Sequence, residues 1–153
     1  DAVETDDNNS GEGIVRIEAV TNADSIGVFN GCLIDSDPST GKPKFSNFYS
    51  QTNITQGKIR GFVFDNPYMR FLIQGDTETA AAQTDVTKTG RFVDTHSGST
   101  TTGISGSELD VSTLGTGEPL RVEGFTGDPQ NNELAIHANY VVSWNEHAYK
   151  DNQ

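Results

Sequence analysis

The sequence is poor in cysteine, in long apolar runs and in any recognisable targeting segment. Cys32 is its single cysteine, so no disulfide can form within the chain, and cysteine usage does not identify a compartment. Because it lies inside an apolar run, this residue is expected to be a small buried hydrophobe. No stretch of about 18 apolar residues occurs, which argues against a membrane span, and no secretory signal is recognisable. The chain begins at Asp1 rather than Met, so a trimmed N-terminus stays open.

Basic residues are also scarce. The chain has 22 acidic and 10 basic residues, which gives a formal net charge of −12 at pH 7. Nucleic acid is therefore not an expected partner, because phosphate binding relies on Lys and Arg side chains that release counterions. A strongly acidic chain is instead kept in solution by its charge and is attracted to basic surfaces.

The sequence also shows little helical periodicity. No long window has the i, i+3, i+4, i+7 apolar spacing of an amphipathic helix, and the best helical candidates are the short pieces TETAAAQ and SGSELDVSTL. The chain consists instead of short runs rich in β-branched and aromatic residues, separated by Gly, Pro, Asn, Asp and Ser. These runs are GIVRIEAV, IGVFNGCLID, PKFSNFY, KIRGFVFD, YMRFLIQG, GRFVDT, PLRVEGF and ELAIHANYVVSW. They predict an all-β fold, as an antiparallel β-sandwich, jelly roll or β-barrel, since a parallel sheet would need crossover helices.

The order of the runs also predicts which strands pair. Between Gly27 and Gln74, the turn SDPSTGK joins one pair of strands and Asn66-Pro67 joins a second pair. Side chains alternate between the two faces of a strand, so alternate residues of the last two runs share a face. In PLRVEGF, one face carries Leu120, Val122 and Gly124, and the other carries Arg121, Glu123 and Phe125. In the final run, one face carries Leu134, Ile136, Ala138, Tyr140 and Val142. One face of each strand is expected to be core and the other to be wet or to touch a neighbour.

Residues 1–13 differ in composition from the rest of the chain. This segment, DAVETDDNNSGEG, contains five acidic residues and no basic one. It has too little apolar surface to offset the entropy lost on ordering, so it predicts a flexible, acidic N-terminal arm that orders only against a partner. Residues 14–153 are expected to form a single all-β domain, long enough to bury about two-thirds of the surface of its unfolded chain.

No pattern in the sequence predicts a metal site. The turn that starts at Asp35 resembles a calcium loop, but its sixth and twelfth positions hold Thr40 and Ser46 in place of the required Gly and acidic residue. A hairpin turn, in which Pro38 fixes φ and Gly41 supplies a positive φ, is the simpler interpretation.

The histidines, serines and carboxylates show no catalytic spacing either. His96, His137 and His147 form no HxH or HExxH arrangement, so no zinc site is expected. Ser105 lies in GISGS, which lacks the final Gly of the G-x-S-x-G nucleophile elbow. Among 22 acidic residues, some pair will reach the spacing of glycosidase carboxylates by chance. The sequence therefore predicts no enzyme, no metal and no cofactor.

Aromatic side chains are the remaining informative set. Those within the runs are expected in the core: Phe29, Phe45, Phe62, Phe64 and Phe71. A second set lies near the ends of runs, where amphipathic rings often anchor an interface. These candidate interface residues, for which core burial is the alternative, are Phe48, Tyr49, Tyr68, Trp144 and Tyr149. The C-terminal segment is polar enough to be exposed and yet aromatic, and packing on a neighbouring subunit is one explanation for this composition.

Several short segments between Gly27 and His147 form a recognisable set. They are GVF with GC, the Asp-rich turn, FSNFY, VFDNP, FLIQ, TGISG, LRV and NEH. Together they resemble the small structural proteins of marine and freshwater tailed bacteriophages, and specifically podovirus-like capsid decoration, or cement, proteins. The resemblance implies a β-rich fold, a homotrimer, no enzymatic activity, and binding to the major capsid protein. It places the protein in the virion, on the capsid exterior, where it would stabilise the shell.

Two other functions stay open. A carbohydrate- or receptor-binding β-sandwich would use Tyr68, Trp144 or Tyr149 as a platform on which sugar rings stack. A hydrolase would use acidic side chains that sequence spacing alone does not single out. The decoration function is the leading expectation, because a β-scaffold with a partner-ordered arm can attach to a shell through many individually weak contacts.

Overall fold

The computed structural model describes most of the chain, and the structural statements below concern these residues: 2–5, 14–16, 25–50, 53–54, 58–76, 79–94, 96–127 and 134–150. They form short strands and two single-turn 3₁₀ helices, η1 (Gln83–Asp85) and η2 (Val111–Thr113). Every pair of named strands is antiparallel. The prediction of an all-β, antiparallel fold is confirmed. No helix in the described residues is long and apolar enough to cross a membrane.

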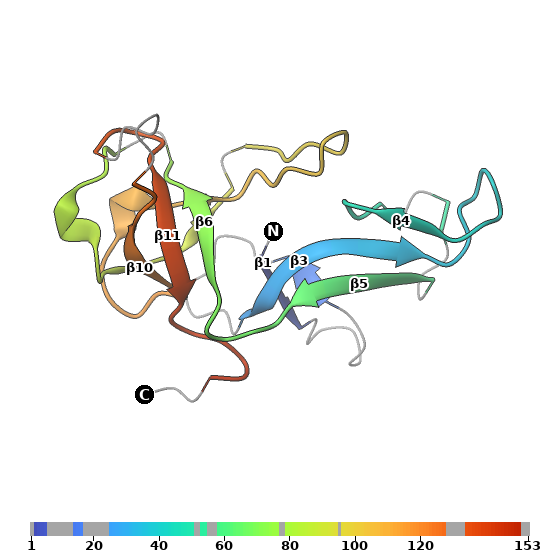
Figure 1. Ribbon diagram of the computed structural model, residues 1–153, viewed down its shortest axis with the longest axis horizontal. Helices are drawn as coiled ribbons and strands as arrows, with labels where there is room; N and C mark the ends of the chain where they lie inside the picture. Colours follow the sequence, from blue (N-terminus) through green and yellow to red (C-terminus); the bar gives the residue numbers. More distant parts are fainter. Residues whose placement is uncertain are drawn as a thin grey trace.

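One sheet is built on the long strand β3 (Ser25–Ile34). Along one edge, β3 pairs first with β1 (Ala2–Thr5) and then with β4 (Lys44–Ser46), and along the other edge it pairs with β5 (Ile59–Phe64). β1 also pairs with β2 (Ile14–Arg16). The part of this sheet formed by β3, β4 and β5 projects from the rest of the molecule (Figure 1). We call residues 28–46 and 58–65 the wing.

The second sheet forms the body of the molecule. Its strand order is β6 (Arg70–Gln74), β11 (Asn139–Trp144), β10 (Leu120–Phe125) and β7 (Thr89–Gly90). The NYVVSW sequence of β11 is rich in the β-branched and aromatic residues that favour strands, and its alternate residues are fully buried. This sheet therefore has one core face, as the alternation predicts.

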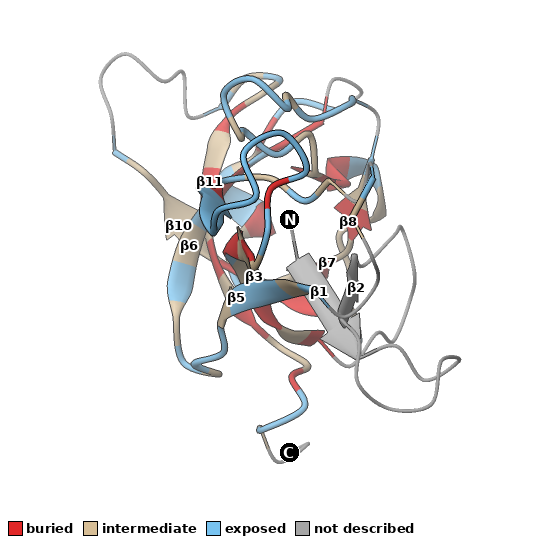
Figure 2. Ribbon diagram, turned by 90° about the vertical axis from the view of Figure 1, so that its right-hand side faces the viewer, coloured by how far each residue is buried: buried red, intermediate tan, exposed pale blue. Residues whose placement is uncertain are grey.

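The hydrophobic core lies in the body. A short strand pair, β8 (Phe92–Val93) and β9 (Glu108–Leu109), contributes to it. The buried cluster comprises Ile73, Ala81, Phe92, Leu109, Val111, Leu120, Val122, Ala138, Tyr140, Val142 and Trp144. Of the wing, Val28 packs against this cluster. By contrast, β5 is mostly exposed (Figure 2).

At two places in the body, the residues do not alternate between buried and exposed as the sequence predicts. The pairing of β10 with β11 shifts between Val122 and Gly124, so the expected phase is lost and Phe125 turns toward the core. The ring of Phe125 lies 5.1 Å from that of Tyr140. Leu134 and Ile136 were expected to share a face with Tyr140 but are exposed, because the strand begins only at Asn139 and they precede it in a turn.

The pairing of strands is predicted correctly for one hairpin and wrongly for the other. β3 and β4 form the expected hairpin, but β5 and β6 belong to different sheets. Between them, the Asn66 side chain accepts a hydrogen bond from the Tyr68 N–H and its carbonyl accepts one from the Met69 N–H, at 3.0 and 3.1 Å. This turn sends the chain from the wing into the body instead of folding it back.

The N-terminal segment contributes a strand to the first sheet. Ala2–Thr5 form β1 and pair with β3, in a segment whose composition predicts a flexible arm. Main-chain pairing at a sheet edge does not depend on apolar composition, which is why composition failed to indicate it. Residues 1 and 6–13 lie outside the described residues.

Contacts at both ends hold the wing against the body. Near its base, the Ser25 hydroxyl donates to the Glu146 carbonyl at 3.1 Å, and the Ala148 N–H donates to the Ser25 carbonyl at 2.9 Å. Just beyond β4, the Asn47 side-chain amide donates to the Thr102 carbonyl at 2.9 Å. Thr102 belongs to the loop that reaches from the body toward β4 in Figure 1. The wing is therefore tied to the body at two separated points.

Candidate binding surface

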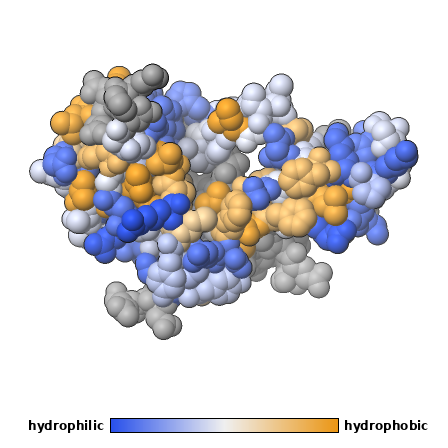
Figure 3. Space-filling view, viewed as in Figure 1, coloured by the Kyte–Doolittle hydropathy of each residue, from blue (hydrophilic) through white to orange (hydrophobic). Residues whose placement is uncertain are grey.

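One face of the wing carries three exposed phenylalanines. Phe45, Phe62 and Phe64 are 60%, 45% and 51% exposed, and the rings of Phe45 and Phe62 lie 6.1 Å apart. We call these three residues the aromatic face. Figure 3 shows hydrophobic atoms over the middle of the wing and hydrophilic atoms at its tip. Exposed aromatic rings gathered on a single sheet face are typical of an interaction site.

The strand register explains why these rings share a face. Leu33 of β3 pairs directly with Phe45 of β4 on one side and with Arg60 of β5 on the other. Directly paired residues point to the same face of a sheet, and so do alternate residues along a strand. Phe62 and Phe64 therefore lie on the face of Arg60, Leu33 and Phe45.

The expectation that Phe45, Phe62 and Phe64 belong to the core is wrong. The buried side of the wing is the opposite face, where Cys32 and Ile34 are 0% and 5% exposed. A run rich in aromatic residues indicates a strand but does not say which of its faces another part of the chain will cover.

The other two phenylalanines expected in the core are partly buried. Phe71 packs against the core cluster, with its ring 5.0 Å from that of Trp144, and Phe29 is half-buried on β3. Cys32 is buried as expected, and its thiol donates to the Phe48 carbonyl at 3.4 Å. Burial raises the pKa of the Cys32 thiol, which keeps it protonated and unreactive at neutral pH.

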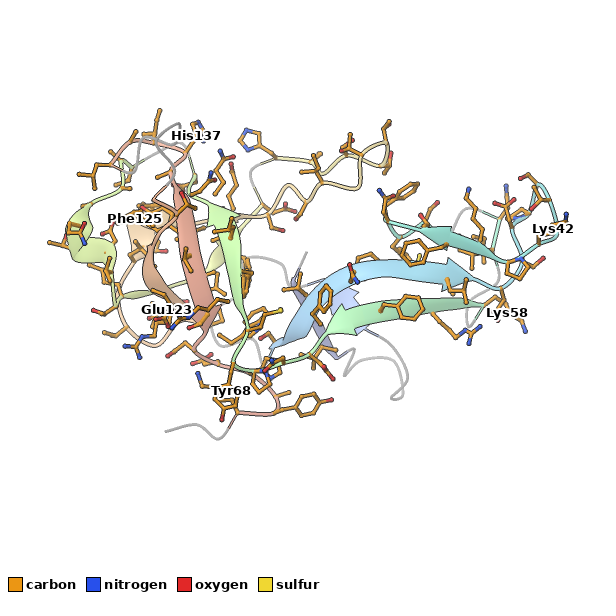
Figure 4. The ribbon with its side chains drawn as sticks, in the orientation of Figure 1. Lys42, Lys58, Tyr68, Glu123, Phe125 and His137 are labelled. Carbon is orange, nitrogen blue, oxygen red and sulfur yellow. The ribbon has the colours of Figure 1, made fainter. Side chains whose placement is uncertain are left out.

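The charge of the wing differs from that of the whole chain. The wing holds four basic residues (Lys42, Lys44, Lys58 and Arg60) and three acidic ones (Asp35, Asp37 and Asp65), a net charge of +1 against −12 for the chain. Arg60 pairs with Asp35 at 2.9 Å and Lys44 with Asp37 at 3.3 Å. Lys42 and Lys58 lie at the tip (Figure 4), where no ion-pair partner for either is found among the described residues. The wing thus combines apolar rings with uncompensated positive charge.

The Asp-rich turn at the tip of the wing is held by its own carboxylate. Asp37 is nearly buried and accepts hydrogen bonds from the Ser39 and Thr40 N–H groups at 2.8 and 3.2 Å, and from the Ser39 hydroxyl. The bonds from Ser39, followed by Lys44, lower the pKa of Asp37 to about 2. Gly41 has the expected positive φ, 68°, so the hairpin-turn prediction is confirmed. Within the described residues, no three His, Cys, Asp or Glu side chains gather as a metal ion would require.

The five candidate interface residues do not form one surface. Tyr49, Tyr68 and Tyr149 are exposed, at 58%, 77% and 67%, and Phe48 is half-buried. Phe48 and Tyr49 follow β4. Tyr68 and Tyr149 lie in the turn after β5 and in the C-terminal segment, where the Lys150 ammonium is 6.0 Å from the centre of the Tyr68 ring.

Trp144 is the candidate that the structure contradicts. It is 0% exposed and packs against Phe71 and Phe92, with ring centres 5.0 and 6.1 Å away. As the last residue of β11, it continues the inward set of Tyr140 and Val142, so strand parity outweighs its position near a strand end. Trp144 belongs to the core and cannot stack on a ligand in the folded protein.

Two buried polar groups in the body maintain structure. The Tyr140 hydroxyl faces the Asp85 carboxylate at 3.4 Å, and that carboxylate also accepts from the Ala82 N–H at 2.7 Å and pairs with Lys88 at 3.0 Å. Burial, reinforced by Asp85 and Asp76, raises the pKa of the Tyr140 hydroxyl far above its ordinary value. These contacts fasten η1 to β11.

His147 is the second buried group. It is 2% exposed, and its Nδ1 accepts a hydrogen bond from the Tyr149 N–H at 3.1 Å. An accepting Nδ1 requires a neutral ring with its proton on Nε2. Burial lowers the pKa of His147, outweighing the opposite effects of the Ile26 backbone and Asp65.

Comparisons with protein-family models, with curated proteins and with solved structures found no match for this chain. Function is therefore argued from the fold and from the wing. The aromatic face was missed in the sequence, although one signal could have found it. Arg60 has the same strand parity as Phe62 and Phe64, and a charged residue marks the solvent-facing side of a strand.

Proposed function

We propose that this protein is a virion structural protein, a capsid decoration or cement protein that docks on the outside of a phage head through its aromatic face. The observation that carries the proposal is the wing, a three-stranded projection with Phe45, Phe62 and Phe64 exposed on one side. A shape of this kind suits attachment to a partner better than it suits turnover of a substrate. The proposed partner is the major capsid protein.

The energy available from the aromatic face fits repeated attachment. Fully burying a phenylalanine contributes about 1.5 to 3 kcal/mol, and roughly half of each ring is already buried, so each contributes about 1 kcal/mol on docking. Three such rings give on the order of 3 kcal/mol per copy, which is far too little for tight binding of an isolated molecule. Many copies that reinforce one another on a shell would turn such weak contacts into stable attachment.

The anchoring of the wing supports the same proposal. A surface that must be ordered on binding loses affinity to conformational entropy, whereas a pre-ordered surface does not. Ser25 and Asn47, which flank residues 28–46 of the wing, are hydrogen-bonded to the body. The aromatic face is therefore presented in one geometry before any partner arrives.

Co-sedimentation with empty capsids tests this function. The probe is an empty capsid assembled from the major capsid protein encoded in the same phage genome as this chain. Wild-type protein is expected to saturate the capsid surface, and Phe62→Ser together with Phe64→Ser is expected to abolish binding. Leu72→Ser is a matched control, because Leu72 is 63% exposed on β6, away from the wing. Absence of wild-type binding, or an equal loss in the Leu72 variant, would count against the proposal.

A carbohydrate-binding function is the second candidate, in a revised form. With Trp144 buried, the remaining platform is formed by Tyr68 and Tyr149, which are the two most exposed of the candidate rings. A saturable hit on a glycan array that Tyr68→Ala abolishes and Phe62→Ser leaves unchanged would support it. The reverse pattern would assign binding to the wing.

A further inference from the structure

The outer edge of β5 has no neighbouring strand in the described part of the chain. β5 pairs only with β3, and the residues of this edge run from Ile59 to Phe64. A strand edge presents main-chain N–H and C=O groups to whatever can pair with them. It is therefore a site for an additional strand.

The main-chain groups that point outward can be identified. The Asp35 N–H donates to the Lys58 carbonyl at 3.0 Å, so Lys58 turns its main-chain groups toward β3. Hydrogen bonding alternates along an antiparallel strand, which gives Arg60, Phe62 and Phe64 the same direction. The N–H and C=O groups of Ile59, Gly61 and Val63 consequently point away from β3.

We propose that two copies of this chain pair through β5, antiparallel, about a two-fold axis that passes beside Gly61. In this register Ile59 lies opposite Val63 of the second copy, and Gly61 lies opposite Gly61 of the second copy. All three outward-pointing residues of each strand are then paired, giving about six main-chain hydrogen bonds. Gly61 has no side chain, so no pair of side chains meets at the axis.

The side chains favour this register over those centred closer to Lys58. It places Arg60 opposite Phe62 of the second copy and Lys58 opposite Phe64, so each cation lies beside an aromatic ring. Centring the axis on Arg60 would oppose two Arg60 side chains, and centring it on Ile59 would oppose Lys58 and Arg60. Both alternatives bring like charges together, which destabilises a cross-strand pair.

The charge distribution favours a second copy as the occupant of this edge. Two whole chains, each with a net charge of −12, repel one another, but the wing carries +1. Pairing through the wings brings the least repulsive parts of the two chains together. The strand is also complementary to itself, as an interface between identical copies across a two-fold axis requires.

Pairing would create one continuous sheet in the order β4, β3, β5, β5, β3, β4. Directly opposed residues of antiparallel strands point to the same face, so the two aromatic faces would join on one side. This pairing does not rest on the capsid function, although it would double the apolar surface available for docking. It differs from the homotrimer that the family resemblance implies.

Sedimentation of the full chain over a range of concentrations tests the pairing. The wild type is expected to form dimers. Phe62→Arg would place an arginine opposite Arg60 twice in each dimer, and it is expected to raise the dissociation constant by about tenfold or more. The double variant Arg60→Glu/Phe62→Arg restores opposite charges in this register and is expected to restore dimers. Leu72→Arg, on the exposed face of β6, is the control and should dimerise normally.

Hydrogen exchange gives a readout that needs no variant. On concentration, the N–H groups of Ile59, Gly61 and Val63 should become protected, whereas those of Arg60 and Phe62 should be protected in the monomer as well. The pairing would be overturned if the wild type stayed monomeric or formed trimers. It would also be overturned if Phe62→Arg left the dimers unaffected, or if the dimers lacked the alternating pattern of protected N–H groups. Dimers that fail to bind capsids would leave the pairing intact and count against the decoration function alone.

Discussion

Replacing Trp144 by alanine should strongly destabilise the protein, because this residue is part of the core and not of an interface. Its side chain is 0% exposed and contacts the rings of Phe71 and Phe92. Truncating a buried tryptophan to alanine typically costs about 3 to 5 kcal/mol, through lost burial and the cavity left behind. A domain of this kind is stable by about 5 to 15 kcal/mol, so this single change should remove a large share of the free energy of unfolding.

Trp144→Phe should lower the free energy of unfolding by less than the reduction in side-chain volume suggests. The indole N–H of Trp144 is buried, and no acceptor for it is found among the described residues. A buried donor without an acceptor carries a desolvation cost of about 1 to 3 kcal/mol, which Trp144→Phe removes. We therefore expect Trp144→Phe to retain most of the stability that Trp144→Ala loses.

Equilibrium urea denaturation measures both variants on one scale. Tyr149→Ala serves as the control, because Tyr149 is 67% exposed and its removal should change the free energy of unfolding by less than about 0.5 kcal/mol. If Trp144→Ala cost less than about 1 kcal/mol, the reasoning that places this ring in the core would be refuted. That result would make Trp144 a candidate again for stacking against a sugar ring.

Three further predictions concern buried or strained positions. Because burial lowers the pKa of His147, the unfolded chain binds more protons than the folded one below pH about 6.5. The melting temperature should accordingly fall as the pH drops through that range, and His147→Gln should make this fall smaller. An equally steep fall in the His147→Gln variant would contradict the assignment of the pH dependence to His147. In Gly103→Ala, the added Cβ would lie 2.3 Å from the Asn47 amide nitrogen at a φ of +73°, so the wing contact should break at a cost of about 1 to 3 kcal/mol in urea denaturation. Full stability in that variant would show that the loop does not hold the wing. The Cys32 thiol should react with a thiol reagent only after unfolding, and rapid labelling of the native protein would disprove its burial.

The sequence alone determined the local conformations. Strands β4, β5, β6, β10 and β11 each fall within a β-type run, whereas β9 lies in SGSELDVSTL, a segment expected to be helical. Gly41 adopts the positive φ that the hairpin turn needs. The inward direction of Tyr140 and Val142 also follows from alternation, because side chains point to opposite faces in turn. These properties depend on each residue and its near neighbours, which is why a single sequence can specify them.

Only the tertiary structure decided which faces are covered. Alternation places Phe62 and Phe64 together with Arg60 but does not say whether another segment packs on them. The same limit applies to Trp144, whose burial depends on Phe71 and Phe92 from distant parts of the chain. It applies as well to β5 and β6, which are adjacent in sequence but join different sheets. Burial and pairing depend on segments remote in sequence, so the wing and its aromatic face emerge only from the folded chain.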